Sequence, residues 1–129
     1  MLIAGFYVAL GALLVLALAI RVMWLRNVYG IGMGSGEHKD LSRAIRAHAN
    51  AVEYLPIAML LLVLLALEQT RPGLLHACGI VLIAARVLHA IGLSAHPGRS
   101  FGRVVGAGLS LLVMLAMAAL LIFRYALAP

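Results

Sequence analysis

Residues 43–56 read Arg-Ala-Ile-Arg-Ala-His-Ala-Asn-Ala-Val-Glu-Tyr-Leu-Pro, and the almost wholly apolar run Ile57–Leu67 follows at once. A helix turns about 100° per residue, so four polar side chains fall within an arc of about 80°. They are Arg43, Arg46, Asn50 and Glu53. Ionisable side chains inside a membrane are costly, face the protein interior or water, and are candidates for function. The stretch therefore predicts a membrane helix with one polar stripe.

The composition of the chain is that of an integral membrane protein. It has 129 residues, of which 65% are hydrophobic and 11% are charged, and its mean hydropathy is +1.12. A helix of about 20 apolar residues crosses a bilayer core of about 30 Å. Four such stretches predict an all-α fold, a four-helix membrane bundle that forms a single domain over residues 1–129. The predicted spans cover about 2–26, 41–68, 74–95 and 102–127.

The first apolar stretch lacks the pattern of a cleaved signal peptide. No basic region precedes it, its apolar run is too long, and no small-x-small cleavage site is evident before Arg21. We therefore expect this stretch to remain as the first membrane helix.

Basic residues are distributed unevenly among the connections. The second connection holds only Arg71 and the C-terminal tail only Arg124. The first and third connections and their edges hold Arg21, Arg26, Lys39, Arg43, Arg46, Arg99 and Arg103. Because cytoplasmic loops of membrane proteins are rich in lysine and arginine, we expect both connections in the cytoplasm and both termini outside. No nucleic-acid partner is expected, since the chain lacks a basic, solvent-exposed face.

The first connection and the second helix contain residues with specific backbone preferences. Residues 29–36 read Tyr-Gly-Ile-Gly-Met-Gly-Ser-Gly, which predicts a loop. Asp40 or Ser42 is predicted to cap the second helix. Pro56 removes one backbone hydrogen bond, so we expect it to kink this helix where neighbouring helices satisfy the freed carbonyl.

The length of the second helix determines how deep its polar residues lie. A helix over 41–68 is roughly 42 Å long, which exceeds the thickness of the bilayer core. Its first turns then project into the cytoplasmic interface, with Arg46 near the edge of the core and Glu53 inside it. A carboxyl group at that depth must be paired or neutral. Arg46, Arg86 and Asn50 are its available partners.

The third and fourth helices carry polar and small residues at helical spacing. Arg86 and His89 lie one turn apart, and His96 continues the same face before Pro97-Gly98 ends the third helix. The fourth helix carries a small-xxx-small ladder, which favours close helix packing. The ladder consists of Gly102, Gly106 and Ser110.

Arginines outnumber carboxylates on one side of the membrane, where Glu53 is the only intramembrane acid near them. These arginines are Arg21, Arg26, Arg46, Arg86, Arg99 and Arg103. Because guanidinium forks suit carboxylates, the surplus indicates a site for an anionic ligand. The alternative is a polar network that only clamps the second helix to the third, or one subunit to another.

The residue types present limit the chemistry. The sequence has no serine–histidine–acid set and no metal-ligand spacing, and its single cysteine, Cys78, fits a buried apolar position. An enzyme of this kind would take its nucleophile from the substrate. A nearby arginine and the positive end of the fourth helix could stabilise a substrate thiolate. Transport is a weaker alternative, because the charges crowd one side of the membrane rather than its midplane.

The segment over 32–67 resembles the second-helix signature of the MAPEG family, the membrane-associated proteins in eicosanoid and glutathione metabolism. The matching residues are Arg46-Ala-His-Ala-Asn50-Ala-Val-Glu53-Tyr54-Leu-Pro56, preceded by the glycine-rich loop. Residues 85–90, Ala-Arg-Val-Leu-His-Ala, resemble the family's third-helix motif. The length and the four spans are similar to those of the small bacterial branch.

The resemblance implies a four-helix protomer assembled as a homotrimer, with glutathione bound between neighbouring subunits near the cytoplasmic face. Residues that would line this site are Arg46, Asn50, Glu53, Tyr54, Arg86 and His89. The family's thiolate-stabilising arginine corresponds to Arg103 or Arg99, and its first-helix arginine to Arg26 or Arg21. Leu93 stands where some family enzymes have a tyrosine, which argues against transferring a specific eicosanoid reaction.

The leading functional hypothesis is a glutathione-dependent transferase or peroxidase that acts on lipophilic electrophiles arriving from the bilayer. Arg46 and Arg86 would bind the carboxylates of glutathione, and Arg103 or Arg99 would stabilise its thiolate. The alternative is a non-catalytic membrane protein whose polar network serves oligomerisation. The resemblance also implies a bacterial inner membrane, with the site facing the cytoplasm.

Overall fold

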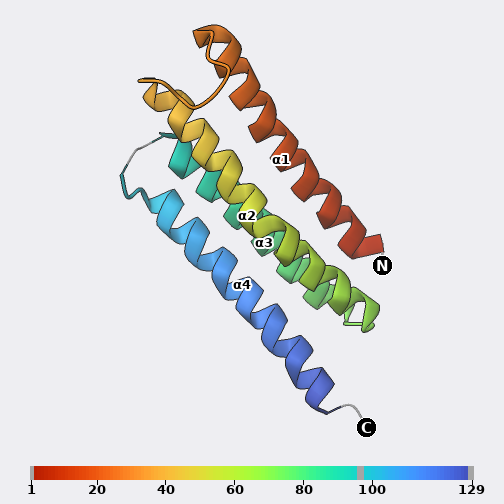
Figure 1. Cartoon of the computed structure of the whole chain (residues 1–129). Helices are drawn as coiled ribbons and strands as arrows, with labels where there is room; N and C mark the ends of the chain where they lie inside the picture. The colour runs from red at the N-terminus through yellow and green to blue at the C-terminus, as the bar shows by residue number, and fades with distance from the viewer. Residues whose placement is uncertain (1, 96–97, 128–129) are drawn as a thin grey trace.

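The computed structural model describes residues 2–95 and 98–127, which form four helices joined by short connections (Figure 1). The helices are α1 (Leu2–Tyr29), α2 (Lys39–Leu67), α3 (Pro72–Ala95) and α4 (Phe101–Ala126). Each helix is long and apolar enough to cross a membrane. The predicted all-α fold with four spans is thus confirmed, whereas the prediction for His96 lies outside the described residues.

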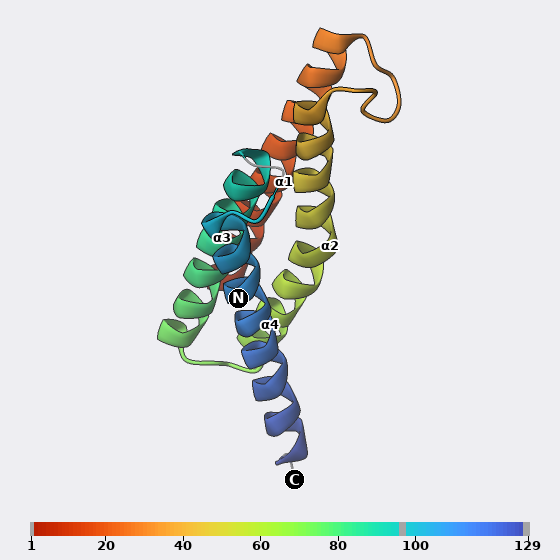
Figure 2. The same cartoon turned by 90° about the vertical axis from the view of Figure 1, so that its left-hand side faces the viewer.

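The helices run side by side, and their connections alternate between the two ends of the bundle. The α1–α2 and α3–α4 connections lie at one end, and the beginning of α1 and the end of α4 lie towards the other (Figures 1 and 2). Helix α1 packs against α2 and α3, and α4 packs mainly against α3. Within the described part of the chain, α1 and α4 do not contact each other, so α2 and α3 hold the bundle together.

The helix boundaries lie within three residues of the predicted ones, and the largest difference is at the end of α1. This helix continues to Tyr29, where Gly30 adopts a positive φ of 65°. The backbone N–H of Ile31 then donates to the carbonyl of Arg26 at 3.0 Å, and Ile31 packs beside Leu25. This is the hydrogen-bond pattern of a glycine-terminated helix, and it orders the start of the loop.

The prediction that Asp40 or Ser42 caps α2 is wrong. The helix begins at Lys39, and its N-cap residue, His38, makes no side-chain capping bond. Asp40 instead accepts a hydrogen bond from the hydroxyl of Tyr29, whose ring stacks on His38 with 3.8 Å between centroids. Both contacts are made by Tyr29, and they tie the end of α1 to the start of α2 across the glycine-rich loop. Helix α2 therefore begins at Lys39, earlier than the local capping residues predict.

Helix α2 continues through Pro56 without interruption. Figure 2 shows the lower half of α2 leaning away from the line of its upper half. Proline lacks an N–H to donate to the preceding turn, which accounts for a bend at this point. The buried side of α2, which includes Leu55, Ala58, Leu62 and Leu65, forms much of the hydrophobic core.

The small-residue ladder on α4 permits the close helix packing that was predicted, and the helix packed against it is α3. A Cβ atom added at Gly106 would lie 2.6 Å from the carbonyl oxygen of Ala85 and from the backbone nitrogen of His89. One added at Gly102 would lie 3.0 Å from the carbonyl oxygen of Leu88. Glycine has no side chain at these positions, so it permits the short distance between the backbones of α3 and α4. The close approach sets the start of α4 directly beside the end of α3.

Candidate functional site

A cleft of about 350 Å³ lies between α2, α3 and α4 at the end of the bundle that carries the first and third connections. Eight residues line it: Lys39, Ser42, Arg43, Arg46, Asn50, His89, Leu93 and Arg103. Four of these side chains are cationic, and none is a carboxylate. A cleft with this lining is electrostatically complementary to an anion.

The α2 wall of the cleft contains three of the four residues of the predicted polar stripe, together with Lys39 and Ser42. Arg43, Arg46 and Asn50 follow one another at spacings of three and four residues, so they share one side of the helix. The side chain of Arg46 is exposed, whereas Arg43 is half-buried. The Nε atom of Arg43 is buried and has no hydrogen-bond partner among the described residues. An anion in the cleft would offer this guanidinium an acceptor.

Arg86 lies behind the cleft rather than in its wall. Its side chain is 3% exposed, and its Nε donates to Oγ of Ser110 on α4 at 2.7 Å. Its NH1 group donates to Oδ1 of Asn50 on α2 at 3.1 Å. The hydroxyl of Ser110 in turn donates to the carbonyl of Gly106 at 2.7 Å. One guanidinium therefore joins three helices and fixes the orientation of an amide that faces the cleft.

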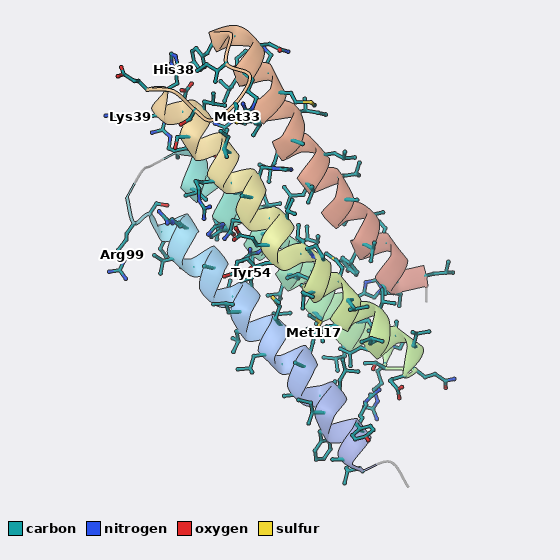
Figure 3. All side chains as sticks on the ribbon, in the orientation of Figure 1. Met33, His38, Lys39, Tyr54, Arg99 and Met117 are labelled. Carbon is teal, nitrogen blue, oxygen red and sulfur yellow. The ribbon has the colours of Figure 1, made fainter. Side chains whose placement is uncertain are left out.

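The structure distinguishes the two arginines at the start of α4. Ser100 is the N-cap of this helix, and its hydroxyl oxygen accepts a hydrogen bond from the backbone N–H of Arg103 at 3.3 Å. Arg103 lines the main cleft and also a neighbouring hollow of about 450 Å³. Arg99 lines only that neighbouring hollow, and its side chain is exposed. Figure 3 shows Arg99 at the same end of the bundle as Lys39.

The α3 wall of the cleft combines one polar and one apolar residue. His89 is 6% exposed, and it lines both the main cleft and the neighbouring hollow. Leu93, one turn further along α3, is 8% exposed and lines the main cleft. Leu93 therefore gives an otherwise polar cleft an apolar patch.

Glu53 and Tyr54 do not line the cleft. Glu53 is exposed on the surface of the bundle, and no basic group lies within ion-pair distance of it in the part of the chain that the structure describes. Tyr54 is half-buried, and the guanidinium carbon of Arg86 lies 5.1 Å from the centre of its ring. This is the geometry of a cation–π contact. Tyr54 thus contacts the buried network through Arg86.

The two arginines of α1 also lie outside the cleft. Arg26 donates to the carbonyl of Gly32 at 2.8 Å, so it supports the glycine-rich loop. Arg21 donates to the hydroxyl of Ser94 on α3. Neither residue belongs to the lining of the main cleft.

Four cleft residues were absent from the predicted site: Lys39, Ser42, Arg43 and Leu93. Arg43 belongs to the same stripe as Arg46, so the helical periodicity that identified the stripe could also have assigned it to the site. Lys39 and Ser42 lie one further turn towards the start of α2. They were not predicted as site residues, because the first turn of α2 was expected to belong to the loop and to the N-cap of the helix.

Comparison with known proteins agrees with the resemblance of the motifs. The family model described as "MAPEG family" matches residues 4–123. The chain is 39% identical over 90 residues to "Inner membrane protein YecN" of Escherichia coli strain K12, an alignment that covers 70% of this chain and 69% of that protein. The protein of the same name from Escherichia coli O6:H1 matches with the same values. With its four apolar helices of membrane-spanning length, this chain is an integral membrane protein that belongs to the MAPEG family.

Proposed function

We propose that the chain binds glutathione in the cleft between α2, α3 and α4 and uses it in transferase or peroxidase chemistry on lipophilic electrophiles. The observation that supports this most is the lining of the cleft, which contains four cationic side chains and no carboxylate. Glutathione carries two carboxylates and a thiol, so it needs several cations at separate positions. Membership of the MAPEG family is the reason for choosing glutathione among possible anionic ligands.

The residues of α2 have distinct roles in this proposal. Arg46 is exposed at the cleft and Arg43 has a buried, unpartnered Nε, so both can offer charge-assisted hydrogen bonds to carboxylates. Asn50 can offer its amide to the peptide backbone or the amine of glutathione. Arg86 contributes through Asn50, whose amide oxygen it holds at 3.1 Å. Arg86 is 3% exposed and does not line the cleft, so we assign it this supporting role rather than direct binding of a carboxylate.

Arg103 is the residue that we assign to the thiol. It lies in the first turn of α4, where the helix N-terminus adds a partial positive charge. A thiol bound there loses its proton to water, because both positive groups stabilise the thiolate. The sulfur then attacks an electrophilic carbon, a C–S bond forms, and the leaving group departs with its electron pair. With a hydroperoxide, the sulfur attacks the outer oxygen, which gives an alcohol and a sulfenic acid that a second thiol reduces to a disulfide and water.

The proposed assembly is a homotrimer in a bacterial inner membrane, with the cleft facing the cytoplasm. Glu53 is exposed at a depth where a lone carboxylate is costly, so a second copy of the chain is its expected partner. The glutathione site would then lie between subunits, with Glu53 completing it. The relative from Escherichia coli is named an inner membrane protein, and the basic first and third connections favour the cytoplasmic side.

The experiment that tests the proposal is the thermal stability of the purified protein in detergent against increasing glutathione. A ligand at about 100 times its dissociation constant stabilises the folded state by about 2.7 kcal/mol, so binding gives a measurable, saturable shift. We expect Arg46→Ala to lose this shift while it keeps its oligomeric state. Arg71→Ala removes a charge at the other end of the bundle and serves as the matched control.

Unchanged affinity in Arg46→Ala would contradict the proposed site. A folded, oligomeric wild-type protein that shows no shift with glutathione would contradict the proposed ligand. A panel of lipophilic electrophiles, tested with and without glutathione, then separates binding from catalysis.

A specific observation also supports the second candidate, a non-catalytic assembly protein. The Arg86 network joins α2, α3 and α4 through bonds between protein side chains, which is what a purely structural network would do. This candidate predicts that Glu53→Gln disperses the oligomer and that glutathione changes neither stability nor mass.

A further inference from the structure

A second groove, of about 400 Å³, lies between α1 and α3. Its apolar wall includes Leu14 and Leu18 from α1, and Val87 and Ile91 from α3. At about 100° per residue, Val87 and Ile91 lie about 160° around α3 from His89, which lines the main cleft. The groove is therefore separate from the proposed glutathione site, and it opens on the opposite face of α3.

One end of this groove is polar. Arg21 and Ser94 both line it, and NH1 of Arg21 donates a hydrogen bond to Oγ of Ser94. Among the described residues, no carboxylate lies within ion-pair distance of Arg21. Arginine has five N–H donors, so a guanidinium that donates one hydrogen bond to a hydroxyl can still bind an anion through the others. The groove thus combines an apolar channel with one cationic end.

The cationic end lies at the depth of lipid headgroups. Arg21 follows Leu2 by 19 residues, which is about 28 Å along a helix, close to the thickness of the bilayer core. Trp24, one turn further on, is 62% exposed, as expected for an aromatic residue at the membrane interface. From Arg21, the groove runs towards the middle of the membrane, along Leu18 and Leu14.

We propose that the α1–α3 groove binds an anionic glycerophospholipid of the leaflet at the loop end of the bundle. Its phosphate would accept hydrogen bonds from Arg21 and Ser94, and an acyl chain would lie against the apolar wall. The bilayer supplies this ligand at high local concentration, and an anionic headgroup matches the unbalanced charge of Arg21. A zwitterionic headgroup brings an ammonium group close to that guanidinium and should bind less well.

The test compares phosphatidylglycerol with phosphatidylcholine of the same acyl chains, added to the delipidated protein in detergent. We expect phosphatidylglycerol to raise the melting temperature saturably and to appear as one bound molecule per chain in native mass spectrometry. Phosphatidylcholine should do neither at the same mole fraction. Arg21→Gln should lose the bound lipid, and Arg71→Gln, which removes a charge at the opposite end, should retain it.

Two milder variants keep the proposal testable if Arg21→Gln fails to fold. Val87→Phe places a larger side chain in the groove from a position that is 37% exposed, so it should block the lipid with Arg21 intact. Ser94→Ala removes only the hydroxyl and should weaken lipid binding several-fold. Equal effects of the two lipids, or full lipid binding in Arg21→Gln and Val87→Phe, would overturn the proposal. Loss of the oligomer in Arg21→Gln with no change in bound lipid would assign the groove to a second copy of the chain.

Discussion

Arg86 on α3 donates a hydrogen bond to Asn50 on α2, with 3.1 Å between NH1 and Oδ1. Arg86 is buried in the protein and Asn50 faces the cleft, so the bond links the core of the bundle to the candidate site. The second bond of the same guanidinium, to Ser110, extends the link to α4. One side chain therefore both joins three helices and orients a residue of the cleft wall.

Replacing Arg86 by leucine should destabilise the protein by about 1–3 kcal/mol, because it leaves the buried hydroxyl of Ser110 and the amide of Asn50 without their partner. Lysine at this position keeps the charge but lacks the planar fork that reaches both acceptors, so it should restore little. Denaturant or thermal unfolding in detergent measures the change. Arg71→Leu, at an exposed position, is the control, and equal stability of the two variants would show that the network contributes nothing.

Replacing Gly106 by alanine should separate α3 from α4. The added Cβ would lie 2.6 Å from two backbone atoms of α3, which cannot move without shifting the helix. We expect a loss of about 1–3 kcal/mol, the size seen for overpacked interiors.

Gly108, two residues further along α4, provides the matched control. A Cβ at this position meets nothing within 4 Å. Because alanine is the better helix former by about 1 kcal/mol, Gly108→Ala should leave stability unchanged or raise it. Thermal melts of both variants check the pair, and similar losses in both would contradict the assignment of the Gly106 result to its close contact with α3.

The helices were predictable because the bilayer imposes a length and a hydropathy that are visible in the sequence. A close helix contact of α4 was also predictable, since Gly102, Gly106 and Ser110 recur on one helical face, but the sequence did not identify α3 as its partner. The start of α2 was not, because the contact of Tyr29 with Asp40 joins residues from different helices, and capping rules consider only local neighbours.

In the candidate site, too, some features were predictable from the sequence and others were not. The arginine–asparagine stripe follows from periodicity, and Arg46 and Asn50 do line the cleft. Periodicity could not reveal that Arg86 turns inward to Asn50 and Ser110, nor that Arg103 rather than Arg99 enters the cleft. Those placements depend on how closely α3 and α4 approach, which the helical period of a single helix does not specify.

Gln69 should be replaceable by glycine with a gain in stability. It ends α2 with a positive φ of 52°, and the N–H of Thr70 donates to the carbonyl of Leu65 at 3.1 Å. A side chain in this left-handed conformation is strained, and glycine relieves the strain at the C′ position of a helix. We expect Gln69→Gly to stabilise the protein by about 1 kcal/mol in thermal unfolding. Gln69→Ala keeps the Cβ atom and should show no such gain, and a gain in both variants would point to the loss of the amide instead.

Variants of Arg103 and Arg99 test most directly which residue stabilises the thiolate. The two side chains carry the same charge, but only Arg103 lines the main cleft. Arg103 lies in the cleft beside Leu93 and His89, and Arg99 is exposed beyond it. If Arg103 stabilises the thiolate of bound glutathione, Arg103→Ala should bind glutathione with similar affinity but show much less thiolate, measured by its ultraviolet absorbance across a pH series. The midpoint of that titration should move to higher pH in Arg103→Ala, since the thiolate loses its nearest cation.

Arg99→Ala should leave the titration near that of the wild type, because a solvated guanidinium beyond the cleft is screened by water and salt. The opposite result, a shift in Arg99→Ala alone, would assign the thiol to the neighbouring hollow of about 450 Å³ that Arg99 lines. Equal, small shifts in both variants would mean that the helix N-terminus and not a single side chain holds the thiolate. In that case Ser100→Ala, which removes the side-chain cap of α4, should change the titration more than either arginine variant does.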